Sequence, residues 1–452
     1  MTDTPIAAIV LAAGQGVRMK SSKPKVLHEV GGRTMLAHVM DAAGALDLDR
    51  LAVVVGEDGG DIGDAAKALR ADTAVAVQSP PRGTADAVKQ ALPALEGFDG
   101  VVLVLYADTP LVTSETLSAL CAEAADGAAA TVLGFHAYDP GAYGRLKTGD
   151  DGALTAIVEA ADATPEELEI DLCNSGVMAI ESGFLRKALP KIGADNAKGE
   201  YYLTDIVMLA HEAGLTCVVI EADEAEVLGV NSRVELAVAE SLFQDRMRIR
   251  AMAAGATLID PSTVYFSYDT RLGADVVVGP NVVFGVGVSV ADNAEIKAFS
   301  HLEGATVGEG AAIGPFARLR PGALLSAKAR VGNFVEVKNA TIGEGAKANH
   351  LAYIGDADVG ARANIGAGMI TCNYDGVSKH RTEIGEDAFI GSNSALVAPV
   401  KVGRGAYVGS GSVITGDVEE DALAVARGRQ RNIRDWAARF RKQGGAKKKS
   451  GD

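Results

Sequence analysis

The sequence is poor in aromatic residues, cysteines and basic charge, and each shortage excludes a class of protein. Aromatic residues make up 5% of the 452 residues, with a single tryptophan, Trp436. Lys and Arg number 43 against 59 Asp and Glu, and the net charge of −16 lacks the basic footprint of a nucleic-acid-binding protein. The four cysteines show no CxxC or metal-ligand spacing, so we expect free thiols in a reducing cytoplasm.

Long apolar runs are also missing. No run approaches the length of a membrane span, and no basic region precedes the apolar segment near the N-terminus, so we expect neither a membrane helix nor a signal peptide. The only basic run, Lys447–Lys449, is expected to belong to a flexible tail. What the chain has instead is glycine, at 53 residues, and 48% hydrophobic residues. Its length favours about two or three domains.

The chain up to about Val230 alternates short β-type runs with helical stretches. IAAIVL, LAVVVG, TAVAVQ and VVLVLY indicate buried strands, and TADAVKQALPAL and TSETLSALCAEAA indicate helices. This alternation predicts a parallel α/β sheet, which binds ligands at the carboxyl ends of its strands. From Ser232 to Ala254, apolar residues at helical spacing predict one long helix. We therefore expect a first domain over 1–233, a linker helix over 234–254 and a second domain over 255–452.

The second domain shows a period of six residues. An aliphatic or aromatic residue, often followed by glycine, recurs at this spacing with a few slips in phase, and a hexapeptide period predicts a β-helix whose recurring residue points inward. The stretch Thr371–Glu383 interrupts the pattern, and loops of this kind often carry function. The recurring positions are Val278, Phe284, Val290, Ile296, Val307, Ile313, Leu319, Leu325, Val331, Val337, Ile342, Ile354, Val359, Ile365, Ile384, Ile390, Leu396, Val402, Val408 and Ile414.

A glycine-rich loop, LAAGQGVRM, follows the first predicted strand. It is not a P-loop, because GxxxxGK[ST] is absent, and it is not a dinucleotide fingerprint, because Met19 stands where the third glycine of GxGxxG belongs. The remaining interpretation is a loop whose backbone approaches a nucleotide, with Arg18 and Lys25 as cations for its phosphates. The alternative is an ordinary turn with surface charges, but the two glycines together with Arg18 and the Pro24-Lys25 pair favour phosphate binding.

The stretch LAAGQGVRMKSSKPKVL resembles the LAAGxGxRMxSxxPKxL signature of sugar-1-phosphate nucleotidyltransferases. Joined to a hexapeptide β-helix, it makes the chain similar, from Leu11 to about Arg427, to the bacterial bifunctional N-acetylglucosamine-1-phosphate uridyltransferases/glucosamine-1-phosphate acetyltransferases. The resemblance implies a Rossmann-like first domain, a left-handed parallel β-helix and a cytoplasmic homotrimer whose acetyl site uses more than one subunit. It implies acetylation of glucosamine-1-phosphate by acetyl-CoA, followed by transfer of UMP from UTP to give UDP-N-acetylglucosamine for peptidoglycan and lipopolysaccharide.

Uridylyl transfer needs positioning and charge neutralisation rather than a protein nucleophile. Asp108 comes just after the strand VVLVLY, where a carboxylate for Mg²⁺ is expected, and the resemblance pairs it with Asn231. It also implies catalytic roles for Arg18 and Lys25. Ala107 stands where glycine is usual, and its methyl group could crowd the nucleotide; EAADA also departs from the family, which has basic residues there. The nucleotide and sugar residues implied are Leu11, Ala12, Ala13, Gly14, Lys25, Gln78, Gly83, Thr84, Tyr106, Ala107, Asp108, Gly144, Glu159, Asn174 and Asn231, with Lys198–Asp205 as part of the wall.

Acetyl transfer needs a base, because the ammonium form of the acceptor is not a nucleophile, and histidine is the usual choice. A lone histidine is more often structural, but His350 in NHLAYIGD matches the catalytic histidine of the family. The resemblance assigns the acetyl acceptor to Arg320, Lys338, Tyr353 and Asn364. It assigns acetyl-CoA to Ala367, Asn373, Tyr374, Ser392, Ser410 and Arg427, with Ser410 at a position that is more often alanine.

Two alternatives remain. A glucose-1-phosphate adenylyltransferase also joins these folds but has a regulatory β-helix, and NHLAYIGD and TCNYDG argue against it. A scaffold or regulatory subunit that has lost catalysis is the non-enzyme alternative, and the presence of Arg18, Lys25, Asp108, Asn231 and His350 argues against that.

Overall fold

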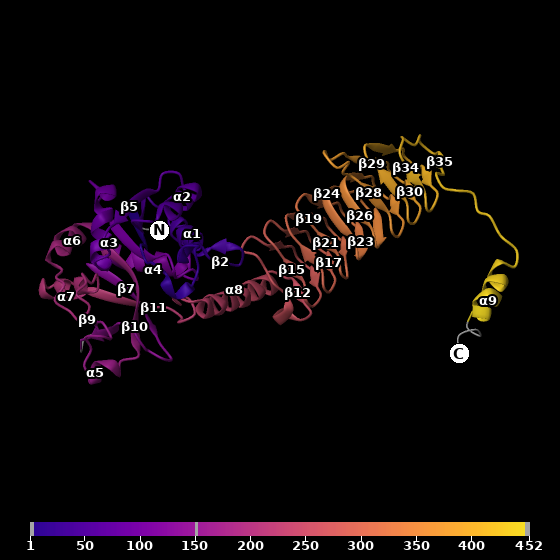
Figure 1. Ribbon diagram of the computed structural model, residues 1–452. Coiled ribbons are helices and arrows are strands. Elements are labelled where there is room, and N and C mark those ends of the chain that lie inside the picture. Colours follow the sequence, from indigo (N-terminus) through magenta and orange to yellow (C-terminus); the bar gives the residue numbers. More distant parts are fainter. Residues whose placement is uncertain (1–3, 150–151, 448–452) are drawn as a thin grey trace. The chain divides into compact units, whose positions relative to one another are not determined.

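The computed structural model describes residues 4–149 and 152–447, in two compact units (Figure 1). The first unit runs to Arg250 and includes Phe266–Tyr268; the second comprises Ala251–Tyr265 and the chain from Asp269 onward. Of the expected basic tail Lys447–Lys449, the last two residues lie outside the described part of the chain. No helix in the described ranges is long and apolar enough to cross a membrane.

A mixed sheet forms the centre of the first unit, with strand order β11-β7-β10-β6-β1-β4-β5. β1 pairs in parallel with β6 and β4, as expected, but β10 runs antiparallel to both β6 and β7, so the predicted all-parallel sheet is wrong at this strand. The reason is the connection from β7 to β10, which carries the β8–β9 hairpin instead of the long crossover helix that a parallel pair requires. The strands are β1 (Ile6–Ala12), β4 (Arg50–Gly56), β5 (Ala74–Gln78), β6 (Val101–Tyr106), β7 (Ala130–His136), β8 (Arg145–Thr148), β9 (Leu154–Val158), β10 (Leu172–Glu181), β11 (Cys217–Glu221) and the separate pair β2 (Glu29–Val30) and β3 (Arg33–Thr34).

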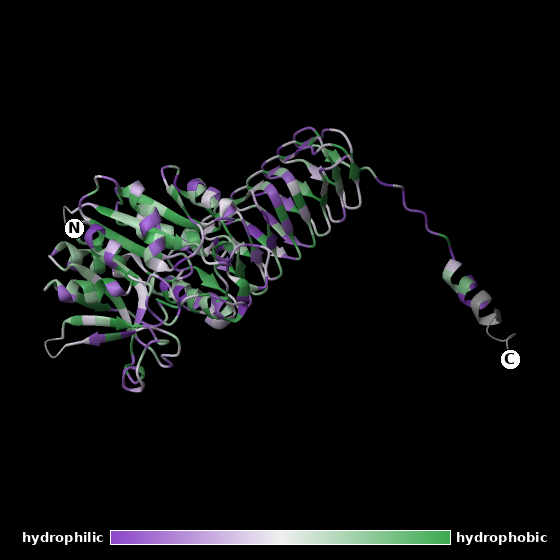
Figure 2. Ribbon diagram, turned by 60° about the vertical axis from the view of Figure 1, so that its left-hand side comes forward, coloured by the Kyte–Doolittle hydropathy of each residue, from purple (hydrophilic) through white to green (hydrophobic). Residues whose placement is uncertain are grey.

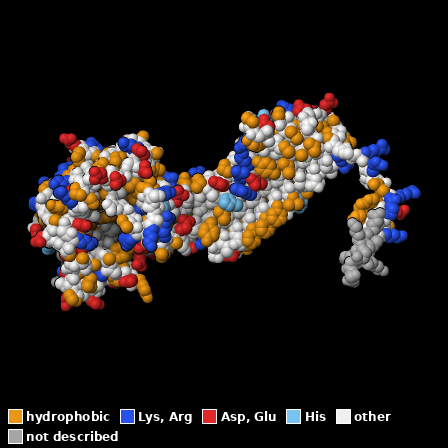
Figure 3. Space-filling view, viewed as in Figure 1, with side chains coloured by type: hydrophobic (Ala, Val, Ile, Leu, Met, Phe, Trp, Pro, Cys, Tyr) orange, Lys and Arg blue, Asp and Glu red, His pale blue; other side chains and the backbone are white. Residues whose placement is uncertain are grey.

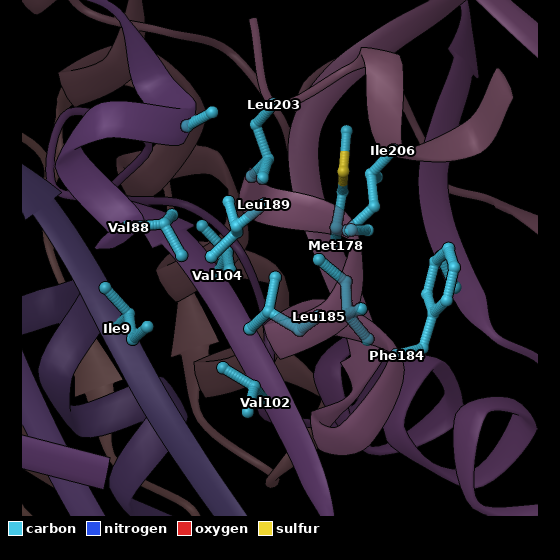
Figure 4. Packing of buried hydrophobic residues seen from close by; sticks show 14 of the residues in the cluster. Ile9, Val88, Val102, Val104, Met178, Phe184, Leu185, Leu189, Leu203 and Ile206 are labelled. Carbon is cyan, nitrogen blue, oxygen red and sulfur yellow. The ribbon is translucent and has the colours of Figure 1, made fainter. Parts of the chain in front are cut away.

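Helices cover both faces of this sheet, so alternate residues of each strand enter different cores. Ile9 and Val104 belong to one core with α3, α6 and α7 (Figure 4), whereas Val10 and Leu105 belong to the other. Burial on both faces explains why the strand segments are continuously apolar (Figure 2). The helices are α1 (Met35–Gly44), α2 (Gly60–Leu69), α3 (Thr84–Ala91), α4 (Ser114–Ala125), α5 (Pro165–Leu168), α6 (Ser182–Ala188) and α7 (Asp205–Glu212), with 3₁₀ turns η1 (Val17–Met19), η2 (Lys25–Leu27), η3 (Leu92–Leu95) and η4 (Leu189–Lys191).

The expected linker helix is α8 (Arg233–Ala253), and it belongs to the first unit as far as Arg250. Its buried face carries Ala239, Phe243 and Met247, three of the residues at the predicted spacing. The side-chain amide of Gln244 donates to the carbonyl of Phe266 over 2.7 Å and accepts from its N–H over 2.8 Å. This buried clamp holds Phe266–Tyr268 to the helix.

The second unit is a left-handed parallel β-helix of short strands, and every recurring residue predicted to point inward is at most 5% exposed. Val277 pairs with Glu295 and Ala312 with Arg330, so one coil takes three six-residue units. The strands, with 3₁₀ turn η5 (Pro261–Thr263), are β12 (Thr257–Leu258), β13 (Arg271–Leu272), β14 (Val277–Val278), β15 (Val283–Phe284), β16 (Ser289–Val290), β17 (Glu295–Ile296), β18 (His301–Leu302), β19 (Ala305–Val307), β20 (Ala312–Ile313), β21 (Arg318–Leu319), β22 (Ala323–Leu325), β23 (Arg330–Asn333), β24 (Glu336–Ile342), β25 (Lys347–His350), β26 (Tyr353–Val359), β27 (Asn364–Ile365), β28 (Ile370–Cys372), β29 (Thr382–Ile384), β30 (Phe389–Ile390), β31 (Ala395–Val397), β32 (Val400–Val402), β33 (Tyr407–Val408), β34 (Val413–Ile414) and β35 (Leu423–Ala424).

The predicted interruption is a loop that leaves the coil between β28 and β29, and hydrogen bonds to one carboxylate hold it. Asp375 accepts hydrogen bonds from the N–H groups of Val377 and Ser378, over 2.7 Å and 2.6 Å, and contacts the Nε2 atom of His380 over 2.7 Å. These bonds hold the pKa of Asp375 well below its usual range. The chain ends its described part in helix α9 (Trp436–Lys447).

Candidate functional sites

The first site is a cavity of about 370 Å³ at the carboxyl ends of β1, β5 and β6. It brings together most of the residues that the sequence predicted for the nucleotide, and Glu200 of the predicted wall segment lines it too. A neighbouring cavity of about 480 Å³ shares Gly14, Lys25 and Gln78 with it. The residues lining the first cavity are Leu11, Ala12, Ala13, Gly14, Lys25, Val26, Gln78, Pro81, Gly83, Thr84, Ala87, Tyr106, Asp108 and Glu200.

Two glycines allow the close approaches around this cavity. Gly16 has φ +62, and a Cβ there would lie 2.6 Å from the Cβ of Lys25. Gly83 has φ +113, and a Cβ would lie 2.5 Å from the carbonyl oxygen of Tyr201. The carbonyl of Gly83 accepts a hydrogen bond of 2.9 Å from the buried amide of Gln78, which also fixes the orientation of that side chain. Glycine is therefore required at both positions, because each has a positive φ and an added Cβ would collide with the Lys25 side chain or the Tyr201 backbone.

Lys25, Asp108 and Asn231 converge at the edge of the cavity from three distant parts of the chain. The Lys25 ammonium donates to the Asp108 carboxylate, and it donates to Asn231 Oδ1 over 2.9 Å. Asp108 is held next to Asn231 because its carbonyl accepts from the N–H of Val230 over 2.8 Å. The Lys25 side chain is only 9% exposed and that of Asp108 is 19% exposed, so this is a largely buried charge cluster.

This cluster also has the chemistry of a metal site. The oxygens of Asp108 and Asn231 meet at the ammonium of Lys25, which shows that the pair can hold a cation between them. Carboxylate and amide oxygens suit Mg²⁺, which needs few protein ligands because it keeps several waters. In the described ranges no group of three His, Cys, Asp or Glu is placed to hold a metal ion. The oxygens that Asp108 and Asn231 provide therefore fit a metal shared with phosphates.

The residues expected to bind the sugar form a second group. The N–H of Asn174 donates to the carbonyl of Gly144 over 2.8 Å, and both residues are buried. Glu159 accepts from the hydroxyl of Thr204 over 3.3 Å. Burial raises the pKa of Glu159. None of these three predicted residues lines the cavity described above. Burial and, after it, the charge of Glu159 nevertheless raise the pKa of Tyr106, which does line it, so Glu159 lies close to the cavity.

Arg18 and Ala107 differ from what their motifs suggest. Arg18 is exposed on η1 and lines neither cavity. Ala107 is fully buried in the hydrophobic core, while its neighbours Tyr106 and Asp108 face the cavity. Its methyl group therefore packs in the core instead of lining the cavity, because alternate residues at the end of a strand point in opposite directions.

The second site lies on the β-helix around His350. Its Nδ1 atom contacts the side-chain oxygen of Asn333 over 2.7 Å, and the two residues face each other in the β23–β25 ladder. Asn333 was not among the predicted site residues, since it precedes His350 by one coil and belongs to no motif around it. An amide oxygen at Nδ1 accepts the N–H of the neutral ring and leaves the lone pair of Nε2 free.

Cationic side chains lie on the same β-helix, before His350 in the sequence at Arg320 and Lys338 and after it at Lys379. Arg320 pairs with Glu336 over 2.9 Å, and Lys338 lies 3.9 Å from Asp356. Contact with Lys338 lowers the pKa of Lys379, which comes from the loop after β28 and was missed at the sequence level. On the face shown in Figure 3, Lys and Arg side chains gather on part of the β-helix beside acidic and histidine side chains. Such a cluster provides the positive charge that a sugar phosphate needs.

The remaining predicted residues follow the coils. Asn373 at the start of the loop lies within 3.5 Å of the Tyr353 hydroxyl, and Tyr374 is exposed. Asn364 lies on the adjacent strand β27. Ala367 and Ser392 occupy equivalent corners of successive coils, with Ser410 one coil further and the exposed Arg427 after β35. Backbone bonds from Asn393 to Ala367 and from Gly411 to Ser392, both 2.8 Å, tie these corners into one column.

Comparison with known proteins agrees with both halves of the molecule. A family model of the MobA-like NTP transferase domain matches residues 8–160, and a model of six bacterial transferase hexapeptide repeats matches residues 381–416. The bifunctional protein GlmU of Paramagnetospirillum magneticum is 57% identical, with 100% of each chain covered. That of Azorhizobium caulinodans is 57% identical over 98% of each chain, and that of Paracoccus denitrificans is 55% identical over 95% of this chain and 96% of its own. The chain belongs to the GlmU family.

Membership in the GlmU family agrees with the bifunctional enzyme predicted from the sequence, an acetyltransferase joined to a uridyltransferase. It does not favour a nucleotidyltransferase with a regulatory β-helix or a scaffold subunit. A solved inositol-1-phosphate CTP transferase from T. maritima also matches, with a TM-score of 0.43 and 15% identity over 54% of this chain and 98% of that chain.

Proposed function

We propose that the cavity at the β1 loop performs the uridylyl transfer and that the His350 region performs the acetyl transfer, each with the residues that the sequence predicts. The observation that carries this proposal is the convergence of Lys25, Asp108 and Asn231 at the cavity edge. Three residues from distant segments meet where a triphosphate would need both cations and metal-binding oxygens. In this proposal UTP binds at the first site, and glucosamine-1-phosphate and acetyl-CoA bind at the second.

In the uridylyl step, a phosphate oxygen of N-acetylglucosamine-1-phosphate attacks the α-phosphorus of UTP and pyrophosphate leaves. Asp108 and Asn231 would hold a divalent metal, which we propose to be Mg²⁺ and which supplies charge neutralisation when bound. Lys25 then pairs with phosphate oxygens in place of Asp108, and Arg18, on the exposed loop, adds a second cation. The half-buried Glu159 and the buried Asn174 offer hydrogen-bonding groups to the sugar.

In the acetyl step, Nε2 of His350 takes a proton from the 2-amino group of glucosamine-1-phosphate. The nitrogen forms a bond to the acetyl carbonyl carbon, the carbon–sulfur bond breaks and the coenzyme A sulfur leaves with the bonding electrons. The proton held by His350 then passes to this sulfur, which gives the coenzyme A thiol and the free base. Asn333 supports this role because its oxygen at Nδ1 keeps the proton away from Nε2. Arg320 and Lys338 supply charge for the sugar phosphate.

We also propose that the protein is a cytoplasmic homotrimer that associates through the β-helix. Phe299, Phe316 and Phe334 stack at successive corners with ring centroids 4.9 Å and 5.2 Å apart. Their exposed fractions are 52%, 45% and 56%, so this aromatic ladder is available for contact with another copy. Hydrophobic side chains form rows along the β-helix in Figure 3. Sedimentation equilibrium would test the trimer.

The division of labour is tested by two substitutions assayed for both reactions. Asp108→Asn removes a metal-binding carboxylate and should abolish most uridylyl transfer while acetyl transfer stays near normal. His350→Ala should lower acetyl transfer by roughly 10²–10⁴-fold and leave uridylyl transfer untouched. If either variant loses both activities to the same extent, or keeps both, the assignment of the two sites is wrong.

The proposed domain limits can be tested on fragments. We keep 1–233, 234–254 and 255–452 as the functional division, but the Gln244 clamp on Phe266 ties part of the second range to α8. A fragment that begins at Ser232 keeps this clamp and should acetylate glucosamine-1-phosphate better than one that begins at Gly255. Equal activity of the two fragments would show that the clamp has no part in the acetyltransferase unit.

A further inference from the structure

A buried carboxylate lies between the two halves of the acetyl-transfer site and has no part in the roles assigned above. Asp356 on β26 is 7% exposed and has φ +47, in the left-handed region. Other left-handed corners of the β-helix also carry Asp or Asn, because these residues tolerate that conformation, and those residues are exposed. They are Asp275, Asn281, Asn293, Asn339, Asp387, Asn393 and Asp421. Asp356 is the buried exception among them.

Its contacts lead to both expected substrate sites. Oδ1 of Asp356 accepts from the side-chain amide of Asn339 over 2.6 Å, and Oδ2 accepts from the amide of Asn373. Lys338 Nζ lies 3.9 Å from Oδ2. Asn373 begins the acetyl-CoA loop and Lys338 belongs to the sugar-phosphate group. One carboxylate thus contacts one residue of each group.

The charge of this carboxylate is maintained. Burial acts to raise the pKa of Asp356, but the hydrogen bonds from Asn339 and Asn373 and the charges of Lys338 and Lys379 outweigh it, so the pKa lies below its ordinary value. A buried carboxylate is costly unless it is paired and hydrogen-bonded in this way.

The scaffold does not depend on Asp356. The backbone of β26 is held by its ladders, in which Tyr353 pairs with Ile370 and Ala357 with Thr382. Thr371 adds hydrogen bonds of 2.8 Å and 3.0 Å to the backbone of Gly355. Removing the charge of Asp356 would leave all of these contacts in place.

We propose that Asp356 is a positioning residue for acetyl transfer, which holds Lys338 of the sugar-phosphate site and Asn373 of the acetyl-CoA loop in one fixed arrangement. This rests on the proposed function of the His350 region. Through Asp356 the two substrates meet a common, preorganised set of side chains, so loss of its charge weakens the binding of both.

The first test is Asp356→Asn, which keeps the size of the side chain and its tolerance of a left-handed backbone. The NH₂ group of the new side chain must then face the NH₂ group of either Asn339 or Asn373, so one of the two hydrogen bonds becomes a contact between two donors. KM for acetyl-CoA and for glucosamine-1-phosphate should both rise by roughly tenfold, as expected for loss of a hydrogen bond to a charged group. Uridylyl transfer should not change. The matched control is Asp387→Asn, at another left-handed corner where Asp387 pairs with Arg362 over 2.9 Å, and it should leave both KM values unchanged.

The second test exchanges the two groups. In Asp356→Asn/Asn339→Asp the new amide donates to the new carboxylate at 339 and accepts from Asn373, so every hydrogen bond is restored with the charge moved by one side chain. Both KM values should fall back toward those of the wild type. The proposal is overturned if Asp356→Asn changes neither KM by more than about twofold. It is also overturned if the double variant does not recover and Asp356→Asn loses melting temperature and both activities together, since that is the result of a purely structural role. A wild-type protein that does not acetylate glucosamine-1-phosphate would instead refute the proposed function.

Discussion

Replacing Lys25 by methionine should expose a latent cation site in the first unit. Met has a similar length but no charge, so the variant leaves the Asp108 carboxylate and the Asn231 oxygen without the ammonium that now lies between them. Because both oxygens stay in place, a divalent cation should bind there more readily in the variant than in the wild type, where it must first displace Lys25.

The magnitude follows from the burial of the pair. Breaking a fully buried ion pair costs about 3–5 kcal/mol, and breaking an exposed one costs about 0–1 kcal/mol. With side chains 9% and 19% exposed, Lys25 and Asp108 lie between these limits, and we expect Lys25→Met to cost about 2 kcal/mol. For a unit of this size each kcal/mol lowers the melting temperature by roughly 2–4 °C, so the expected loss is roughly 4–8 °C without metal.

Calorimetric melts of both proteins, with and without millimolar Mg²⁺, measure this effect. Mg²⁺ should restore much of the lost stability of Lys25→Met and stabilise the wild type less, since a ligand stabilises the state to which it binds. Lys23→Met is the matched control, because the side chains of Lys23 and Glu29 are 44% and 53% exposed and their pairing contributes little. The reasoning is refuted if Lys25→Met and Lys23→Met have the same melting temperature, or if Mg²⁺ raises the melting temperatures of Lys25→Met and the wild type equally.

Three further predictions concern single positions. Asn333→Ala should lower kcat of acetyl transfer by about tenfold with little change in KM. Asn333→Asp should move the acid limb of the pH–rate profile to higher pH, because a carboxylate favours the protonated form of His350, and unchanged profiles would contradict the role of Asn333. Glu159→Gln should raise the melting temperature at pH 7. Burial raises the pKa of Glu159, so its ionised form destabilises the folded state at any pH above the ordinary pKa of Glu, and the gain should vanish in melts below about pH 4. Gly83→Ala should lower the melting temperature and uridylyl transfer together, because its Cβ would lie 2.5 Å from the Tyr201 carbonyl oxygen; a normal melt would contradict this packing.

The parts of the fold that a local pattern specifies could be predicted from the sequence. Each six-residue unit of the β-helix carries its own inward residue, and positions such as Val278 and Ile414 are buried as expected. The cavity also lies where a parallel sheet binds ligands, because Leu11 and Tyr106 end neighbouring strands. The direction of β10 could not be predicted in this way, since it depends on the form of the β7–β10 connection.

The site residues that the sequence did not predict have one feature in common: each reaches its partner through contact between coils. Asn333, Asp356 and Lys379 meet His350, Asn373 and Lys338 only because one coil stacks on the next, and the phase slips of the repeat decide which residues become neighbours. Lys25 shows the same limit in the first unit. The motif predicted a cation for phosphates, and only the fold shows that the same ammonium pairs with the expected metal ligands.

Mass spectrometry of the products tests the central claim, that one chain carries two separate active sites. Wild-type protein given glucosamine-1-phosphate, acetyl-CoA, UTP and Mg²⁺ should form UDP-N-acetylglucosamine, pyrophosphate and coenzyme A. Asp108→Asn should stop at N-acetylglucosamine-1-phosphate, and His350→Ala should form the nucleotide sugar only when N-acetylglucosamine-1-phosphate is supplied. A wild-type protein that leaves glucosamine-1-phosphate unacetylated, or variants that accumulate no separate intermediate, would contradict the account.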